Sequence, residues 1–331
     1  MGSKFVLDES FYTYDFYENA RKQIKKRVPI VIPSYNASEN NILLDFIREN
    51  STKKDYWPVF VVVRHTQKAA YEKNYSDVPG ITFIGMKDSL IAGSGKVRRE
   101  INNYFTGKYK SIFVMDDDTI PRFMARAYSA DGSERYSVDY SKTNIVNIFS
   151  MWQVAHEWLM DQYPHAHMTF LYNRGFIFDL KYARNHCYTL GGKAGCAMCI
   201  ELDRLKKYNL NYLSNEEING GFDDADLLLR GLPYGVYPIK IAFMTCEFPP
   251  MSIDCRGSQE ADASVDNRIV RQWEALYDIY KDKDVIGDYI KLNKKGNLII
   301  NWRRFFKNTY PEVATRGSIY DKVHRWKAIY I

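Results

Sequence analysis

Three consecutive carboxylates follow a short apolar run near the middle of the chain. Asp116, Asp117 and Asp118 come directly after Ile112-Phe-Val-Met115, and Pro121 stops any regular continuation. The apolar run is too short for a helix and rich in strand-forming residues, which is typical of a buried strand in an α/β sheet. Such sheets bind ligands just beyond the carboxyl ends of their strands. Because Mg²⁺ is shared between carboxylates and substrate phosphates, the pattern indicates a divalent ion that holds a diphosphate; a solvated acidic turn is the alternative.

A second acidic group lies in the C-terminal half of the chain. Asp223, Asp224 and Asp226 follow the pair Gly220-Gly221 at the start of an amphipathic helical pattern. Capping and the helix dipole explain one acid at a helix N-terminus. A further carboxylate that faces the first acidic group would act as a general base toward an incoming hydroxyl. The segment on its own leaves both interpretations open.

A glycine-rich segment, Gly93-Ser-Gly-Lys-Val97, differs from a phosphate-binding P-loop. Where that motif needs a glycine and a hydroxyl residue, the chain has Leu90 and Val97. Glycines before a helix start, with Lys96 and Arg98 in the first turns, would still meet phosphate oxygens through backbone amides and cationic side chains. A flexible loop that leads into a solvated basic turn is the alternative.

Hydrophobic runs alternate with helical patterns through most of the chain. This alternation predicts an α/β fold with a mixed, mostly parallel sheet flanked by helices. A surface excursion is expected at 121–141, and a pair of short strands at 165–179. The other expected strands are 28–33, 58–63, 81–86, 112–115 and 235–244, and the expected helices lie near 41–48, 66–74, 93–100, 143–161 and 201–207.

The chain divides into a lead-in at 1–27, a main domain at 28–255 and a mainly helical C-terminal extension at 256–331. From residue 291 to the end there are ten Lys and Arg residues against two acidic ones. Such a basic segment suggests an anionic macromolecule as partner, with nucleic acid the first candidate. A helical extension with a solvated basic face is the alternative. The candidate DNA-binding residues are Lys294, Lys295, Arg303 and Arg304.

Composition excludes several classes of protein. At 331 residues the chain is long enough to bury a large core. No apolar run approaches the roughly 18 residues that cross a bilayer, and the N-terminus is not signal-like, so we expect a cytoplasmic protein without a membrane partner. Five cysteines argue against a disulfide framework. Cys196, Cys199, Cys246 and Cys255 match a zinc site in number, but their spacing favours buried free cysteines.

Four segments, in order, resemble the GT-A class of nucleotide-sugar-dependent glycosyltransferases. The first two are similar to the first strand with its nucleotide-base loop and to the glycine-rich turn that ends in an arginine. The last two are similar to the Asp-x-Asp element and to the helix start Glu-Asp-x-Asp-(x)3-Arg. In the helix start, Asp223 stands in place of the Glu. The resemblance implies the Rossmann-like GT-A fold across residues 28–245. The segments are Ile30-Val-Ile-Pro-Ser-Tyr-Asn36, Gly93-Ser-Gly-Lys-Val-Arg98, Val114-Met-Asp-Asp-Asp118 and Phe222-Asp-Asp-Ala-Asp-Leu-Leu-Leu-Arg230.

The resemblance also implies roles for individual residues. Asp116 and Asp118 would hold Mn²⁺ or Mg²⁺ with the diphosphate. Asp224 would be the catalytic base and Asp223 a catalytic contact to the sugar or acceptor. Gly192, Lys193 and Asp226 are the further candidates on the sugar and acceptor side. The candidates for binding the nucleotide sugar, which we expect to be a UDP-sugar, are Pro33, Ser34, Tyr35, Arg64, Gly95, Lys96, Arg98 and Asp117.

Within the class, the chain resembles the base-J-type and phage DNA glycosyltransferases, which act on hydroxymethylated pyrimidines. The resemblance implies a hexosyl- or pentosyltransferase that modifies DNA by inverting in-line displacement, in the host cytoplasm if the chain is of phage origin. Its basic surface would hold the DNA backbone while the target base is exposed. Two alternatives remain: an enzyme of the same fold with a glycan, lipid or protein acceptor, and a non-catalytic nucleic-acid-binding module.

Overall fold

The computed structural model describes residues 20–128, 134–141, 143–173, 188–247 and 265–311, and the account below concerns these residues. A single mixed sheet runs through the molecule in the order β3-β2-β1-β4-β9-β7-β10-β5-β6, and β8 pairs with β10. The smaller strands β11 and β12 form a separate hairpin.

Four parallel strands make up one half of the sheet. They are β1 (Ile30–Pro33), β2 (Val59–Arg64), β3 (Ile81–Met86) and β4 (Ser111–Met115). The runs in β2 and β4 are almost entirely apolar, as expected for strands with both faces covered. Their carboxyl ends lie at one edge of the sheet, and Asp116 follows directly after β4 at this edge.

The other half of the sheet mixes both directions. It contains β5 (Ile120–Tyr128), β6 (Glu134–Asp139), β7 (Ala166–Asn173), β8 (Tyr188–Leu190), β9 (Ala197–Glu201) and β10 (Tyr237–Glu247). β9 runs antiparallel to β4, and β7 runs parallel to β10. The expected surface excursion at 121–141 is wrong, because β5 and β6 form a hairpin there that buries Phe123 and Val138. The second strand expected near 174–179 lies outside the described residues.

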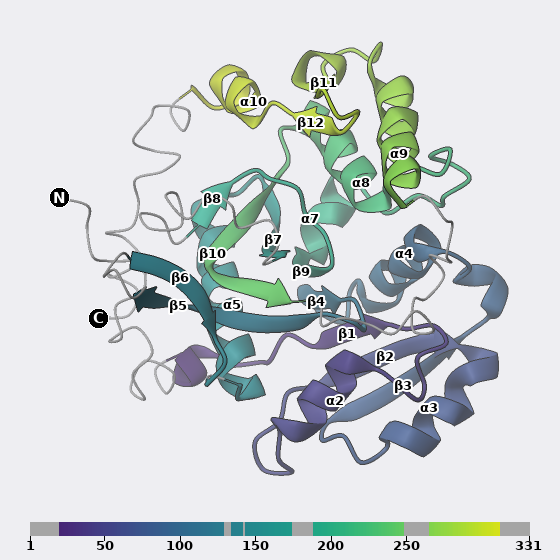
Figure 1. Cartoon of the computed structure of the whole chain (residues 1–331), viewed down its shortest axis with the longest axis vertical. Coiled ribbons are helices and arrows are strands. Elements are labelled where there is room, and N and C mark those ends of the chain that lie inside the picture. The colour runs from purple at the N-terminus through teal and green to yellow at the C-terminus, as the bar shows by residue number, and fades with distance from the viewer. Residues whose placement is uncertain (1–19, 129–133, 142, 174–187, 248–264, 312–331) are drawn as a thin grey trace.

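Helices cover both faces of the sheet (Figure 1). Alternate residues of β4 point to opposite sides: Phe113 packs in one hydrophobic core and Val114 in the other. The first core includes α2, α3 and α5, and the second includes α4 and α7. The mixed α/β sheet flanked by helices is therefore confirmed. The helices are α2 (Ile42–Glu49), α3 (Lys68–Tyr75), α4 (Ser94–Phe105), α5 (Ile145–Gln162), α7 (Leu202–Lys207) and α8 (Asp223–Gly231), with short 3-10 turns η2 (His65–Gln67), η3 (Asp88–Leu90) and η5 (Leu232–Tyr234).

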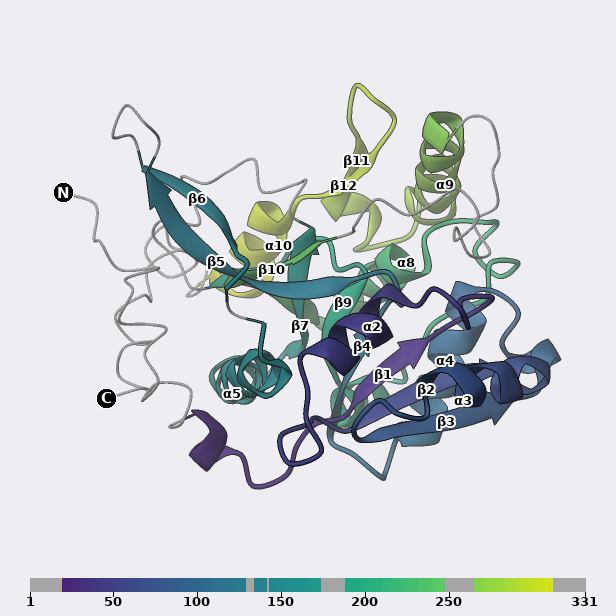
Figure 2. The ribbon, with the colours of Figure 1, turned by 60° about the horizontal axis from the view of Figure 1, so that its bottom comes forward.

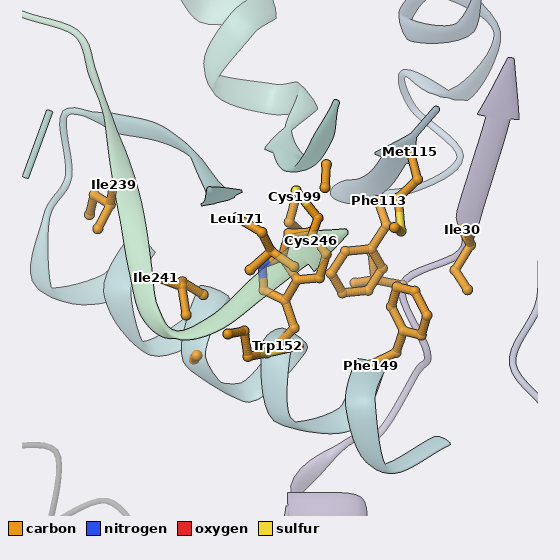
Figure 3. Close-up of a cluster of buried hydrophobic side chains, with 14 of the residues drawn as sticks. Ile30, Phe113, Met115, Phe149, Trp152, Leu171, Cys199, Ile239, Ile241 and Cys246 are labelled. Atoms are coloured by element: carbon orange, nitrogen blue, oxygen red, sulfur yellow. The ribbon is translucent and has the colours of Figure 1, made fainter. Parts of the chain in front are cut away.

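Aromatic side chains fill the larger core beneath β4. Phe113 lies 4.9 Å from Phe149 and 4.8 Å from Trp152 between ring centroids. Figure 3 shows these rings gathered between α5 and the strands. This packing fixes β4, and with it the point at which the acidic segment leaves the sheet.

The C-terminal extension shares the core of the main domain. Its described residues, 265–311, contain α9 (Val265–Tyr280), η7 (Gly287–Tyr289), β11 (Ile290–Leu292), β12 (Leu298–Ile300) and α10 (Trp302–Thr309). Trp273, Leu276 and Phe305 are buried in the larger core, so residues 265–311 are not a separate appendage. Figures 1 and 2 both show α9 beside α8. No helix in the described part of the chain is both long and apolar enough to cross a membrane.

Candidate active site

Arg98 joins the two acidic groups. Its Nη2 lies 2.8 Å from Asp116 Oδ1, and its Nη1 lies 2.9 Å from Asp223 Oδ2 and 3.1 Å from Asp224 Oδ1. The Arg98 side chain is only 7% exposed, so these ion pairs are shielded from water. The sequence predicts that the two groups face each other across one crevice, and the structure brings them together on a single guanidinium.

The local backbone explains this meeting. Asp116 directly follows β4, and its N–H donates to the carbonyl of Cys196, 2.9 Å away. Arg98 lies in the second turn of α4, and Asp223 is the first residue of α8. A Cβ on Gly95 would lie 1.9 Å from the Leu213 carbonyl oxygen, so the glycine lets the segment before α8 approach α4. Gly95, which the sequence predicts to bind the nucleotide sugar, therefore packs against Leu213 in this structure.

Asp224 has the electrostatic setting of a base. Its side chain is 18% exposed, and its Oδ1 forms the ion pair with Arg98 but meets no described residue in hydrogen-bond geometry. Burial raises the pKa of Asp224, Arg98 lowers it, and the charges of Asp223 and Asp116 raise it again; the net result is a pKa well above the usual value. A carboxylate of this kind holds a proton more readily than an ordinary aspartate.

Asp117 and Asp118 both have pKa values above the usual range for aspartate. Asp117 Oδ2 accepts a hydrogen bond from Ser34 Oγ, which also contacts Tyr71 Oη at 2.7 Å. Burial raises the pKa of Asp117 to about 7, helped by the charges of Asp118 and Asp116 and opposed by the Ser34 hydrogen bond. Burial and Asp116 raise the pKa of Asp118 to about 6.

Asp116 and Asp118 suit a hard divalent ion. The charge of Asp116 disfavours ionised Asp118, and a cation between the two carboxylates would relieve this repulsion. Among the described residues no cluster of three or more His, Cys, Asp or Glu side chains could hold a metal ion. Mg²⁺ and similar ions take the rest of their shell from water and substrate phosphates, so two carboxylates fit such an ion.

Residues predicted to bind the nucleotide lie at the neighbouring strand ends. Pro33 ends β1 and is followed by Ser34 and Tyr35, and Arg64 ends β2. The Arg64 guanidinium lies 4.1 Å from the centre of the Tyr35 ring, and its Nε has no partner among the described residues. Since Ser34 also donates a hydrogen bond to Asp117, the end of β1 is in direct contact with the segment 116–118.

Lys96 lies at the surface rather than beside the carboxylates of the Asp116 segment. Its Nζ is 3.2 Å from Glu216 Oε1, and Arg99 forms a similar pair with Glu217 at 3.0 Å. These pairs hold the segment before α8 against α4. A direct contact of Lys96 with phosphate would require this surface pair to open.

Asp226 does not occupy the predicted acceptor side. The residue is fully buried, and it accepts hydrogen bonds from Tyr280 Oη at 2.5 Å and Arg230 Nε at 2.8 Å. We therefore correct this prediction: Asp226 links α8 to α9 and has no surface to offer a substrate. Gly192 has a φ of 119°, and a Cβ there would lie 2.7 Å from the Phe170 ring, so its role is conformational.

Lys193 lies near Asp224 on an aromatic surface. Its Nζ is 4.0 Å from the Trp273 ring centre and 5.0 Å from that of Phe222. Sequence reasoning missed Trp273, which α9 brings to the site. The one signal for it was the spacing of Trp273, Leu276 and Tyr280, which places their side chains on one helix face.

The candidate DNA-binding residues lie apart from the carboxylates. Lys294 and Lys295 are in the turn between β11 and β12, and Arg303 and Arg304 begin α10. All four are exposed, and Arg304 Nη2 lies 3.3 Å from Asp288 Oδ1. The two pairs therefore lie on two different elements of the C-terminal extension.

The cysteines agree with the prediction of free thiols. Cys196, Cys199 and Cys246 are free. Cys196 Sγ and Cys246 Sγ lie 3.6 Å apart, and Cys255 lies outside the described residues.

Comparisons with known proteins find only distant similarity. No protein-family model matches the sequence, and no match is found among curated proteins. Among solved structures, S. aureus TarS 1-349 matches with 12% identity and a TM-score of 0.42, covering 92% of this chain and 87% of that one. Glucosyl-3-phosphoglycerate synthase from Mycobacterium tuberculosis, in complex with Mn²⁺, UDP and phosphoglyceric acid, matches with 10% identity and a TM-score of 0.41, covering 73% and 77%. Because these identities and TM-scores are low, the similarity adds nothing to the topology and contacts described above.

Proposed function

We propose that the protein transfers a sugar from a nucleoside diphosphate sugar, most simply a UDP-sugar, to a hydroxyl acceptor, as GT-A glycosyltransferases do. The observation that supports this most strongly is the meeting of Asp116, Asp223 and Asp224 on Arg98 at the carboxyl edge of the parallel strands. Ligands bind at this edge in open α/β sheets. The four sequence segments that resemble the GT-A class, in the same order along the chain, also support the proposal.

Each group has a distinct task in this proposal. Asp116 and Asp118 hold Mn²⁺ or Mg²⁺, which when bound would neutralise charge on the departing diphosphate. Ser34, Tyr35 and Arg64 bind the nucleotide on the neighbouring strand ends. Asp117 fixes Ser34 by hydrogen bonding, and Arg98 holds the metal side and the base side at a constant separation.

Asp224 accepts the proton of the attacking hydroxyl. Its raised pKa makes its carboxylate a better proton acceptor than that of an ordinary aspartate. The hydroxyl oxygen forms a bond to the anomeric carbon while the bond from that carbon to the diphosphate breaks, and the nucleoside diphosphate leaves. A single base opposite the leaving group corresponds to inversion at the anomeric carbon. Asp223 accepts a hydrogen bond from Arg98 and so keeps the guanidinium oriented beside Asp224.

The acceptor proposed first is a hydroxymethylated pyrimidine in DNA. The exposed residues Lys294, Lys295, Arg303 and Arg304 support it, because exposed cationic side chains bind a phosphate backbone. A glycan, lipid or protein acceptor is the alternative, in which these four residues have no part in transfer.

The experiment is a donor screen with three variants. Nucleotide sugars are incubated with the protein and Mn²⁺ or Mg²⁺, with and without hydroxymethylpyrimidine DNA, and release of the nucleoside diphosphate is measured. Asp116→Asn, Asp118→Asn and Asp224→Asn should each lower the rate by roughly 100-fold or more. A non-catalytic binding module would release no nucleoside diphosphate from any donor, and its DNA affinity would be indifferent to all three substitutions.

A further inference from the structure

Lys193 occupies an unusual place between the sheet and α9. The segment between β8 and β9 turns through Gly191 and Gly192, which have φ values of 77° and 119°. The Trp302 side chain packs against Gly191 and the Phe170 ring against Gly192, so the turn is fixed from both sides. Lys193 follows this turn and reaches toward α9.

Two aromatic rings hold the Lys193 ammonium. It lies 4.0 Å from the centre of the Trp273 ring and 5.0 Å from the centre of the Phe222 ring, and the two rings are 4.3 Å apart. A cation over aromatic faces is attracted by their electron density. Phe222 directly precedes Asp223 and Asp224, so this ammonium is held beside the first turn of α8.

The cation differs from the other cations of the site in its partners. Arg98 is neutralised by three carboxylates, and Lys96 and Arg99 pair with glutamates. Within the described part of the chain, no carboxylate lies within ion-pair distance of Lys193, although the charge of Asp224 acts on it. The residue is exposed, so an anion can reach it from solvent.

We infer that Lys193 binds an anionic group of the acceptor, a phosphate ester, next to the hydroxyl that receives the sugar. The inference rests on the proposed function. The donor diphosphate belongs to the side of Asp116 and Asp118, whereas Lys193 is beside the proposed base Asp224. A phosphate on Lys193 would therefore bring a nearby acceptor hydroxyl to the Asp224 carboxylate.

Phosphodiesters of a polynucleotide and phosphate monoesters of small molecules share this chemistry. The probes are therefore matched pairs that differ in charge: glycerol with glycerol 3-phosphate, and 5-hydroxymethyl-2′-deoxycytidine with its 5′-monophosphate. A short oligonucleotide that contains the same hydroxymethylated base forms the third arm. Binding of each probe to protein loaded with UDP and Mn²⁺ is measured by calorimetry, so the result does not depend on turnover.

At least one phosphorylated probe should bind more tightly than its neutral partner. Lys193→Met should weaken this binding by roughly 10- to 100-fold, because one charge-assisted contact is lost, and leave the neutral partner within about twofold. Lys193→Arg should restore most of the affinity. Binding only of the oligonucleotide assigns the phosphate to a nucleic-acid backbone, and binding of a monoester assigns it to a small acceptor.

Lys207→Met is the matched control. Lys207 also lies over an aromatic ring, 5.1 Å from the centre of Tyr208, but it belongs to α7 at the opposite end of β4 from Asp116. Its replacement should not change probe binding. Equal affinity for phosphorylated and neutral probes, or equal loss in both lysine variants, would overturn the inference. Failure of the proposed function would be seen separately, as a wild-type protein that binds no UDP with Mn²⁺.

Discussion

Arg98 and Asp116 form a partly buried ion pair at 2.8 Å between α4 and the end of β4. The same guanidinium reaches Asp223 and Asp224 at the start of α8, so a single side chain holds together elements that are far apart in the sequence. Three carboxylates around one cation leave an excess of negative charge. This excess is what a divalent ion would offset.

Replacing Arg98 should destabilise the protein. Arg98→Met leaves the buried Asp223 and the partly buried Asp116 and Asp224 without their cation, and the loss of one partner from a buried pair typically costs about 3–5 kcal/mol. Arg98→Lys should recover part of this, since it keeps the charge but not the forked geometry. Urea unfolding measures both variants. An unfolding free energy of Arg98→Met equal to that of the wild type would mean that the ion pairs do not hold the site.

Mn²⁺ should stabilise the Arg98→Met variant more than the wild type. With the guanidinium gone, the carboxylates have greater need of another cation, and a ligand that binds only the folded state raises its stability. The melting temperature with and without Mn²⁺ tests this. Equal shifts in both proteins would contradict a shared electrostatic role of Arg98 and the metal.

Tyr280→Phe should loosen the contact between α9 and α8. The Tyr280 hydroxyl donates to the buried Asp226 at 2.5 Å, and leaving a buried carboxylate without this partner costs roughly 1–3 kcal/mol. Tyr277→Phe is the control, since Tyr277 lies on the same helix and is only partly buried. Comparable losses of unfolding free energy in both variants would show that the hydrogen bond to Asp226 is not the cause.

Gly95→Ala should prevent the approach of α4 to the segment before α8. The new Cβ would lie 1.9 Å from the Leu213 carbonyl oxygen, so the backbone must move. Gly195→Ala is the control for stability, because a Cβ there meets no atom within 4 Å. The melting temperature should fall by several degrees in the first variant only. An unchanged melting temperature for Gly95→Ala would contradict the close contact.

His167 should make the protein less stable in mild acid. The side chain is fully buried, its Nδ1 donates to the Tyr237 carbonyl at 3.1 Å, and its Nε2 has no partner among the described residues. Burial lowers the pKa of His167 to about 4 from 6.5, so the unfolded chain binds more protons between these values. Stability is complete above about pH 6.5 and decreases by up to about 3 kcal/mol toward pH 4.

The control for this pH dependence is His167→Asn. The amide of Asn can donate the same hydrogen bond but does not titrate. Urea unfolding from pH 7 to pH 4 should show a shallower loss in the variant than in the wild type. The same slope in both proteins would assign the acid sensitivity to other groups.

The sequence predicted the parallel half of the sheet and the meeting of the acidic groups. Runs such as Val59-Phe-Val-Val-Val63 are apolar throughout, and this pattern has few structural alternatives. The β5–β6 hairpin was missed because turn residues interrupt the apolar pattern between Phe123 and Val138, which the structure buries. Local pattern did not reveal that Asp226 is buried, because its partner Tyr280 lies 54 residues away. The position of Trp273 beside Lys193 likewise depends on how α9 packs, which is a long-range contact.

The most direct test of the central claim is a calorimetric titration of UDP, with and without Mn²⁺, into the wild type, Asp116→Asn and Asp224→Asn. We predict that the wild type binds UDP tightly only with Mn²⁺. Asp116→Asn should lose this metal-dependent affinity by roughly 100-fold, whereas Asp224→Asn should retain it. Equal UDP affinity with and without Mn²⁺, or an Asp116→Asn variant that binds as the wild type does, would contradict a metal-dependent nucleotide-sugar site at the end of β4.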